Sequence, residues 1–164
     1  MSEPDQREPN LREAARAIII DEREQIVMVK YIFPSGEVRW GTPGGGLDPG
    51  ESHEDGVRRE IGEELGLTEF ELGAHVWSRV HLFPMSTGHD GQRERYFFVR
   101  VEHFTPEPAI GWERMNAEFV HDIRWWTLDE IDASEEGFVP PGLTDRVRQL
   151  LRDGPPTKPV DVST

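Results

Sequence analysis

Residues 45–67, GGLDPGESHEDGVRREIGEELGL, decide how this chain folds. Glycine and proline crowd residues 40–51, so we expect a long loop there and no regular helix or strand. Ser52 can then cap the first turn of a helix, and Asp55 suits the positive end of that helix. Gly66 is placed to end it. The stretch therefore predicts a specific loop followed by a helix between Ser52 and Gly66.

This predicted helix has two unlike faces. Its apolar residues recur every fourth position, as Val57, Ile61 and Leu65. Glu60, Glu63 and Glu64 share another face, where like charges at these spacings cost about 0.2–0.5 kcal/mol each. Gly62 costs about 0.8–1 kcal/mol more relative to alanine. A hard divalent cation such as Mg²⁺ or Mn²⁺ would explain the carboxylates, because it prefers oxygen ligands. The alternative is a solvated acidic face in a structural protein.

Composition narrows the function further. The chain has 164 residues, which argues for one domain, and no cysteine, which excludes disulfides, thiolate zinc sites and a cysteine nucleophile. Its formal net charge of −14 disfavours nucleic-acid polymers and anionic membranes as partners. Any anionic substrate must therefore be attracted locally, by bound cations or by a few placed arginines and lysines.

Both ends of the sequence are predicted to be loosely held tails. Residues 1–12 are polar and lack the apolar stretch of a signal peptide, and residues 153–164 are rich in proline, so we expect both ends to be loosely held. The longest apolar run, 17–20, is far short of the ~20 residues that span a bilayer. We expect a soluble, cytoplasmic protein whose folded domain covers residues 13–152.

The remaining elements alternate between strands and helices. Residues 14–21 and 25–31 predict an antiparallel hairpin, and residues 70–83 and 94–104 predict a second strand pair. The other expected elements are a strand at 122–128, a short helix near 129–131 and a closing helix at 143–151 capped by Thr144. This order favours an α/β or α+β sandwich over a doubly wound parallel sheet.

The spacing of residues 45–67 resembles the Nudix box at every defined position. Gly45 is followed after five residues by Glu51, and after seven more by Arg59-Glu60-Ile61-Gly62-Glu63-Glu64-Leu65-Gly66-Leu67. Nine positions are thus specified within 23 residues. The resemblance to Nudix hydrolases implies an α/β/α sandwich with a mixed central sheet.

The same resemblance implies roles for the box residues. It implies that Mg²⁺ or Mn²⁺ is bound by Gly44, Glu60, Glu63 and Glu64. It implies that Glu51 and Arg59 form an ion pair that, with Gly45, supports the loop. The implied reaction is hydrolysis of a nucleoside diphosphate linked to another group, through in-line attack of a metal-bound water on one phosphorus.

The general base has several candidates. In the family it is either a box glutamate, here Glu60 or Glu64, or a glutamate in a mobile loop downstream. Glu118 and, second to it, Glu113 lie in such a segment between two predicted strands, and either could equally be an ordinary exposed residue.

Substrate contacts are predicted from the basic residues near the box. Lys30, at the end of a strand, and Arg93 and Arg95, which alternate on one strand face, are the candidates, with a solvated surface as the alternative for each. Pro84 lies near the place where a proline accompanies ADP-ribose pyrophosphatases, so the resemblance favours ADP-ribose or a nucleotide sugar.

Other functions stay open at this point. The small-molecule substrate could be a nucleoside triphosphate or a dinucleoside polyphosphate. A non-catalytic nucleotide-binding sensor module is a further alternative, and hydrolysis of capped RNA is a remote one because the chain lacks a basic stripe. Many relatives pair as dimers, so a homodimer is an additional expectation.

Overall fold

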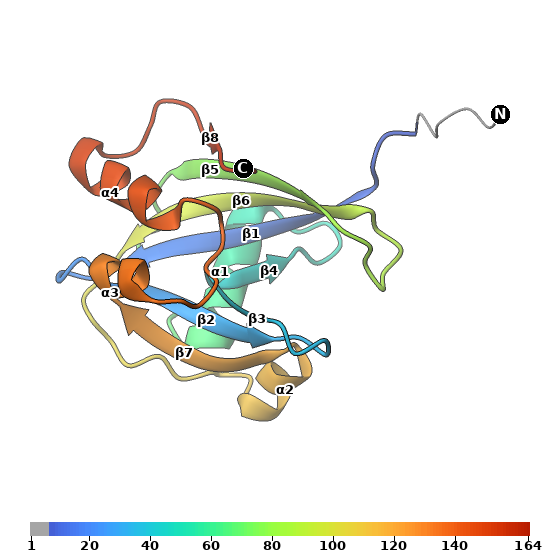
Figure 1. Cartoon of the computed structure of the whole chain (residues 1–164), viewed down its shortest axis with the longest axis horizontal. Helices are drawn as coiled ribbons and strands as arrows, with labels where there is room; N and C mark the ends of the chain where they lie inside the picture. The colour runs from blue at the N-terminus through green and yellow to red at the C-terminus, as the bar shows by residue number, and fades with distance from the viewer. Residues whose placement is uncertain (1–6) are drawn as a thin grey trace.

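A mixed β-sheet with helices on both faces forms the centre of the structure, a computed structural model that describes residues 7–164 (Figure 1). The strands are β1 (Leu11–Ile20), β2 (Ile26–Ile32), β3 (Val38–Gly41), β4 (Gly44–Gly46), β5 (His75–Leu82), β6 (Gly91–Arg100), β7 (Val120–Trp126) and β8 (Val160–Asp161). The helices are α1 (His53–Leu65), α2 (Trp112–Ala117), α3 (Leu128–Ala133) and α4 (Leu143–Asp153). The predicted α+β sandwich with a mixed sheet is confirmed.

Strand β1 organises the sheet. It runs parallel to β6 along its whole length, from Leu11 opposite Gly91 to Ile20 opposite Arg100. On its other side β1 pairs antiparallel with the short strand β4. It pairs with β2 only where Ile20 meets Ile26, so the predicted hairpin forms but supplies little of the pairing of β1. The main path of the sheet is β3-β2-β1-β6-β5-β8, with β7 added beside β2.

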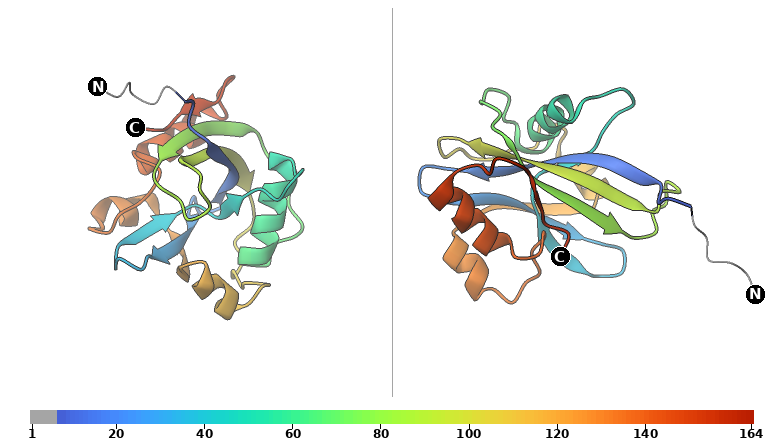
Figure 2. Two further views of the ribbon diagram at one scale, coloured as in Figure 1. Left: turned by 90° about the vertical axis from the view of Figure 1, so that its right-hand side faces the viewer. Right: turned by 90° about the horizontal axis from the view of Figure 1, so that it is seen from above.

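The four consecutive buried residues 17–20 of β1 serve two cores. Ala17 and Ile19 point toward α1, whose stripe of Val57, Ile61 and Leu65 packs against them. Ile18 and Ile20 point to the opposite face, where α3 and α4 supply the partners. Alternation of side chains along a strand sends neighbours to opposite faces, so both faces must be covered. Figure 2 shows α1 on one side of the sheet and α3 with α4 on the other.

Three local expectations are wrong. Residues 40–51 contain regular structure, because Gly44–Gly46 form β4 by pairing their backbone with β1. Helix α4 begins after Gly142, which makes no side-chain cap, and the Thr144 hydroxyl donates to Asp132 instead. The segment between β6 and β7 contains helix α2, whose Met115 is fully buried.

The ends of the chain are held more firmly than expected. Residues 1–6 of the predicted tail lie outside the described residues, but β1 already begins at Leu11. At the other end β8 pairs parallel with β5, and the side chain of Val162 is fully buried. The backbone N–H of Val162 also donates to the carbonyl of Ser78. A proline-rich stretch without periodicity can thus still pack when it finds an unpaired strand edge. Within residues 7–164, no helix is long and apolar enough to cross a membrane.

Candidate functional site

Helix α1 is fixed at both ends as expected. The Ser52 hydroxyl accepts a hydrogen bond from the backbone N–H of Asp55. Gly66 ends the helix in the left-handed region with φ of 70°, and its N–H donates to the carbonyl of Gly62. The loop before the helix and the apolar stripe within it therefore set which way its carboxylates face.

Two of the three box carboxylates on α1 are buried. Glu60 is 9% exposed and Glu64 is 3% exposed, and the Glu64 carboxylate accepts a hydrogen bond of 3.1 Å from the backbone N–H of Gly44. Burial raises the pKa of Glu64 well above its usual value, and the nearby charge of Glu60 raises it further. Burial likewise raises the pKa of Glu60, against the opposing effect of Arg59. Burial of two neighbouring acids therefore makes each carboxyl harder to ionise.

Arg59 joins the loop to the helix. Its guanidinium makes two hydrogen bonds to the Glu51 carboxylate, of 2.9 and 3.0 Å, and donates to the carbonyl of Gly46. Its Nη1 donates to Glu60 at 3.0 Å and to Glu63 at 3.2 Å. The hydrogen bond from Arg59 lowers the pKa of Glu51. The structure thus contains the expected ion pair of Glu51 with Arg59, and it adds contacts from Arg59 to two of the predicted metal ligands.

The predicted metal ligands are only partly gathered. Within residues 7–164, no group of three or more histidine or acidic side chains is close enough to hold a metal ion, because Glu63 is turned toward Arg59. The donors nevertheless fit a hard divalent cation in kind, since buried carboxylates are the ligands that Mg²⁺ accepts. A side chain larger than that of glycine does not fit at position 45, because a Cβ there would lie 2.9 Å from Oε1 of Glu60. Gly44, Glu60, Glu63 and Glu64 are thus neighbours around one loop, with Glu60 and Glu63 sharing the Nη1 of Arg59.

Strand β4 separates these carboxylates from a second charged group. Gly45 faces Glu60 on the α1 side, whereas Gly44 and Gly46 face arginine side chains on the other. A Cβ at Gly46 would lie 2.1 Å from Nη2 of Arg12, and a Cβ at Gly44 would lie 2.9 Å from Cγ of Arg16. The three glycines therefore let opposite charges approach the same strand from its two faces.

Arg16 is the centre of the second group. Its guanidinium is paired with the buried carboxylate of Glu94, and it donates to the carbonyl of Thr42 at 3.0 Å and to the Tyr31 hydroxyl at 3.3 Å. Glu94 is 2% exposed and also accepts from Arg79 at 3.2 Å. Burial alone would raise the pKa of Glu94, but the two arginines lower it overall. Burial raises the pKa of Tyr31 to about 12, so its hydroxyl keeps its proton at neutral pH.

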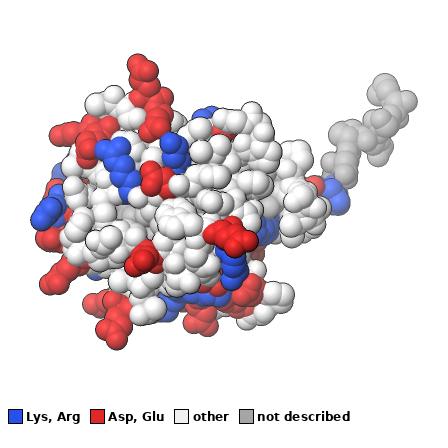
Figure 3. Space-filling model, turned by 90° about the horizontal axis from the view of Figure 1, so that it is seen from below, with Lys and Arg blue, Asp and Glu red and all other residues white. Residues whose placement is uncertain are grey.

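A cavity of about 700 Å³ opens over this arginine group. Two buried polar atoms of its walls, the Thr42 hydroxyl and Nε of Arg79, have no hydrogen-bond partner among residues 7–164. The charged residues of the walls are Arg12, Arg16, Arg39 and Arg79 with Glu37 and Glu94. The cavity is therefore locally positive in a protein whose net charge is −14, as an anionic ligand requires. By contrast, the charged side chains on the face in Figure 3 are scattered and mixed in sign.

The three basic residues predicted to contact substrate lie elsewhere. Lys30 lies 3.9 Å from a carboxylate oxygen of Glu136 and 5.7 Å from the ring centre of Trp40. Arg93 pairs with Glu13 at 3.0 Å, and both Arg93 and Arg95 lie on the face of β6 opposite Glu94. None of the three lines the cavity. Strand alternation explains why the predicted contacts differ from the cavity lining. The sequence shows which residues share a face of a strand but not which face meets the cavity.

The downstream glutamates lie around α2. Glu113 is in the first turn of this helix and Glu118 follows its last residue, and both side chains are exposed. Glu118 directly precedes Phe119, which lines the cavity. Glu118 is therefore next to the cavity wall, whereas the buried Glu60 and Glu64 lie beside β4.

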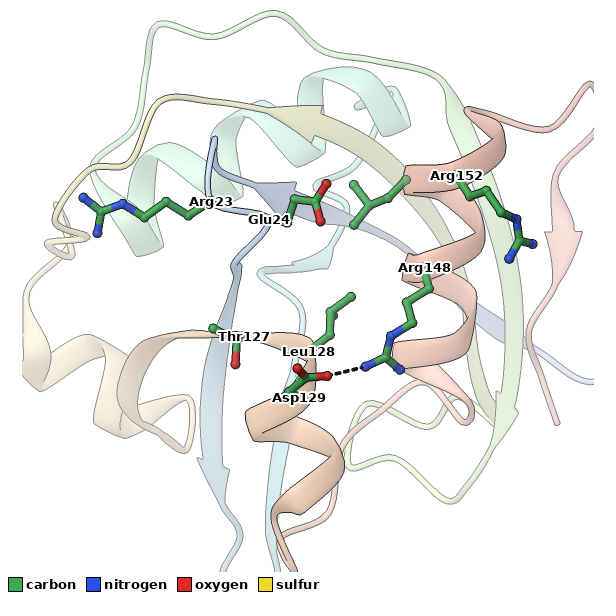
Figure 4. Close-up of a pocket in the computed structure, with 8 residues that line it drawn as sticks. Arg23, Glu24, Thr127, Leu128, Asp129, Arg148 and Arg152 are labelled. Atoms are coloured by element: carbon green, nitrogen blue, oxygen red, sulfur yellow. Dashed lines mark hydrogen bonds and ion pairs between the residues drawn. The ribbon is translucent and has the colours of Figure 1, made fainter.

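A second cavity, of about 450 Å³, lies between the β1–β2 turn and helices α3 and α4 (Figure 4). Arg148 donates to Asp129 across it at 3.0 Å and to Asp132 at 2.7 Å. Figure 4 shows Arg23 and Arg152 extending outward from it in opposite directions. The central arginine of this cavity is already neutralised by two carboxylates, whereas the larger cavity is lined by Arg12 and Arg16, which lie against β4, so the larger cavity is the candidate site.

Comparison with known proteins identifies the family of the chain. The profile of the NUDIX domain matches residues 10–147 of the chain. The chain belongs to the Nudix family. Its box, residues 45–67, lies within the match and carries both the buried carboxylates and the glycines of β4.

Several curated Nudix relatives resemble parts of the chain. An RNA pyrophosphohydrolase of Helicobacter pylori (strain G27) is 39% identical over 74 residues, which cover 41% of this chain and 47% of that enzyme. The chain thus matches about half the length of that relative. The nucleoside triphosphatase NudI of Enterobacter sp. (strain 638) is 32% identical over 118 residues, covering 68% of this chain and 80% of that enzyme.

Solved Nudix structures share the fold at low sequence identity. The NUDIX domain of Shewanella oneidensis NrtR, complexed with ADP ribose, aligns with a TM-score of 0.62 at 19% identity, over 92% of this chain and 94% of that one. The MutT protein of Methanosarcina mazei Go1 aligns with a TM-score of 0.62 at 19% identity, over 90% and 98%. These likenesses establish the architecture.

Proposed function

We propose that this chain is a divalent-cation-dependent hydrolase that cleaves the pyrophosphate bond of a small nucleoside diphosphate derivative. One observation carries the proposal: β4 has buried carboxylates against one face and, against the other, two arginines that line the cavity. Such a pair of neighbouring groups suits a ligand that is bound partly through cations and partly through arginines. Membership of the Nudix family supports the same reaction class.

The cation would be held by Glu60, Glu63 and Glu64 with the carbonyl of Gly44. When bound, a divalent cation supplies charge neutralisation for the phosphates and acidifies a bound water. Holding it requires Glu60 and Glu64 to lose their protons, which their raised pKa values oppose in its absence. Arg59 would release Glu63 and stay on Glu51, because its two hydrogen bonds to Glu51 do not involve Nη1.

The cavity residues would hold the substrate. Arg12 contributes a guanidinium that makes no hydrogen bond or ion pair within residues 7–164, and Arg79 contributes the unpartnered Nε. The Thr42 hydroxyl is a further unused partner. These groups replace Lys30, Arg93 and Arg95 as the proposed phosphate contacts. For the general base we keep Glu60 or Glu64 and, as the downstream candidate, Glu118.

ADP-ribose or a nucleotide sugar is the proposed substrate class. The sequence marker near Pro84 supports it, and Pro84 itself lines the cavity. The NrtR domain, with the same fold, binds ADP ribose. Nucleoside triphosphates and RNA 5′ ends are the competing classes, suggested by the names of the Enterobacter and Helicobacter relatives. The scattered charges in Figure 3 disfavour a long nucleic-acid contact on that face.

A substrate screen tests the proposal. ADP-ribose, nucleotide sugars, nucleoside triphosphates, dinucleoside polyphosphates and short 5′-triphosphate RNA are incubated with Mg²⁺ or Mn²⁺, and phosphate-containing products are measured. Glu63→Gln and Glu64→Gln are compared with Glu69→Gln, an exposed residue beyond the helix. We expect hydrolysis that both box variants abolish and the control retains. Nucleotide binding without turnover would instead identify a sensor module, and equal activity in all variants would exclude the proposed site.

A cytoplasmic location and a homodimer remain predictions from the sequence. Gel filtration with light scattering would measure the oligomeric state.

A further inference from the structure

Two aromatic side chains line the cavity without belonging to the protein core. Phe33 follows β2, and Phe119 follows α2, where its side chain is 41% exposed. Neither is part of the three hydrophobic clusters that hold the fold together. Their ring centres are 6.0 Å apart and their planes are tilted by 53°. They therefore form an angled aromatic pair at the cavity wall, with the Phe119 ring partly exposed to another flat group.

Phe119 has a backbone conformation that is unfavourable for phenylalanine. Its φ is 68°, in the left-handed region that a large aromatic residue rarely adopts. Hydrogen bonds hold it there, because its N–H donates to Asn116 and its carbonyl accepts from Ile32. Asparagine would tolerate this conformation better. Folding alone thus gives no reason for a phenylalanine here, whereas a ligand-binding role would.

The aromatic pair continues directly into the arginine group. The ring of Phe33 lies parallel to that of Tyr31, at 5.9 Å and 5°. The Tyr31 hydroxyl accepts from Arg16 at 3.3 Å. A row of side chains therefore leads from the charged end of the cavity beside β4, through two stacked rings, to Phe119. A molecule with an anionic end and a flat aromatic end is complementary to this row of charged and then aromatic side chains.

We propose that Phe33 and Phe119 form the platform that holds the nucleobase of the substrate, while the arginines hold its phosphates. The inference rests on the proposed function, because it takes the ligand to be a nucleotide. Base stacking on an aromatic ring depends weakly on base identity, since every base has a π-face. The platform therefore selects nucleotides over base-free phosphates and discriminates only modestly among the bases.

Equilibrium binding tests the platform apart from hydrolysis. AMP, which has no pyrophosphate bond to cleave, and ribose 5-phosphate, which has no base, are titrated into the protein by calorimetry in Mg²⁺ buffer. We expect wild type to prefer AMP, and Phe119→Asn to weaken AMP binding roughly tenfold while changing ribose 5-phosphate binding by less than about twofold. Trp112→Ala removes an equally exposed aromatic that does not line the cavity, and should leave both affinities unchanged.

Thermal unfolding separates this role from a structural one. Asparagine accepts the left-handed backbone, so Phe119→Asn should keep or raise the Tm, whereas a phenylalanine needed for packing would lower it. Phe33→Leu, which keeps an apolar side chain, should reproduce the selective loss of AMP affinity. Equal affinity of wild type for AMP and ribose 5-phosphate would overturn the inference, as would equal losses for both ligands in Phe119→Asn. The substrate screen tests hydrolysis independently of these binding and unfolding measurements.

Discussion

The two faces of β4 meet opposite charges, but the charges are balanced differently. On the α1 face, Glu60 and Glu64 are buried next to each other, and both have raised pKa values. On the cavity face, Arg16 and Arg79 share the buried carboxylate of Glu94, whose pKa is lowered. The buried carboxylate of the cavity face is thus paired with two arginines, whereas on the α1 face Glu60 is paired with Arg59 and Glu64 makes no ion pair within residues 7–164. The two faces therefore differ in how far their buried carboxylates are neutralised by the protein itself.

Removing the shared carboxylate should give the largest effect. Glu94→Gln leaves two buried guanidinium groups without a counter-charge, so we expect a loss of about 3–5 kcal/mol in unfolding free energy. Urea unfolding measures it, with Glu37→Gln, an exposed partner of Arg39 at the same cavity, as a control that costs no more than about 1 kcal/mol.

The pH dependence of this loss follows from the sign of the shift. Because the folded pKa of Glu94 lies below its usual value of 4.5, its charge stabilises the fold above that pH. The difference between wild type and Glu94→Gln should therefore shrink as the pH falls below about 4.5. A difference that stays constant down to pH 3 would show that the carboxylate acts only through its shape.

Substitution on the carboxylate face should raise the stability of the metal-free protein. Glu64→Gln replaces a buried carboxyl that is costly to ionise by a neutral amide, so we expect a gain of about 1 kcal/mol and a loss of activity of roughly 100-fold or more. Thermal unfolding in chelator and steady-state kinetics in Mg²⁺ measure the two effects.

The stability gain of Glu64→Gln should also depend on pH. The folded protein holds the proton of Glu64 more tightly than the unfolded chain does, so wild-type stability falls as the pH rises above about 4.5. The variant lacks this fall, and its advantage should disappear near pH 4.5. A variant less stable than wild type at pH 7 in chelator would contradict the assignment of the two faces.

The sequence predicted the carboxylate face much better than the cavity face. The box has fixed spacing within one helix and its loop, so helical periodicity was enough to group Glu60 with Glu64, and the resemblance to the Nudix box supplied the pair of Glu51 with Arg59. The cavity face depends on pairings across the sheet, such as Arg16 with Glu94, which are 78 residues apart. No local pattern reveals such a partner, and the alternation of Arg93 and Arg95 was equally compatible with the opposite face of β6.

Pairing between distant segments also explains the errors in the predicted fold. A triplet of glycines predicts a loop from composition, yet β4 forms because β1 offers its backbone and because any Cβ would collide with a neighbour. The end of the chain carries no periodic pattern, and Val162 is ordered only by the edge of β5. One clue to the cavity was available, since Arg12 and Arg16 are i, i+4 in a strand and so share a face.

Alanine substitutions in β4 should separate the two faces by kinetics. Gly45→Ala places its Cβ 2.9 Å from the Glu60 carboxylate, so we expect roughly tenfold more Mg²⁺ for half-maximal activity, with KM for the nucleotide nearly unchanged. Gly46→Ala instead displaces Arg12 on the other face, and should raise KM with an unchanged Mg²⁺ requirement. If both variants altered the same parameter, the two faces would not act separately.

The smallest effect concerns single arginines. Arg12→Gln should raise KM about threefold, the change expected for losing one partly exposed charge contact. Arg93→Gln removes the same charge from the opposite face and should change KM by less than about twofold. Steady-state kinetics at low ionic strength measure both, and a larger effect at Arg93 would restore the original prediction.

The parallel pairing of β1 with β6 has a consequence for biosynthesis. β1 is synthesised well before β6, the strand that pairs with its full length and that ends at Arg100. Throughout that interval one edge of β1 lacks its native partner strand and is open to self-association with other nascent chains. Yield in the cell should therefore depend on elongation speed and on chaperones more than the stability of the finished protein would suggest.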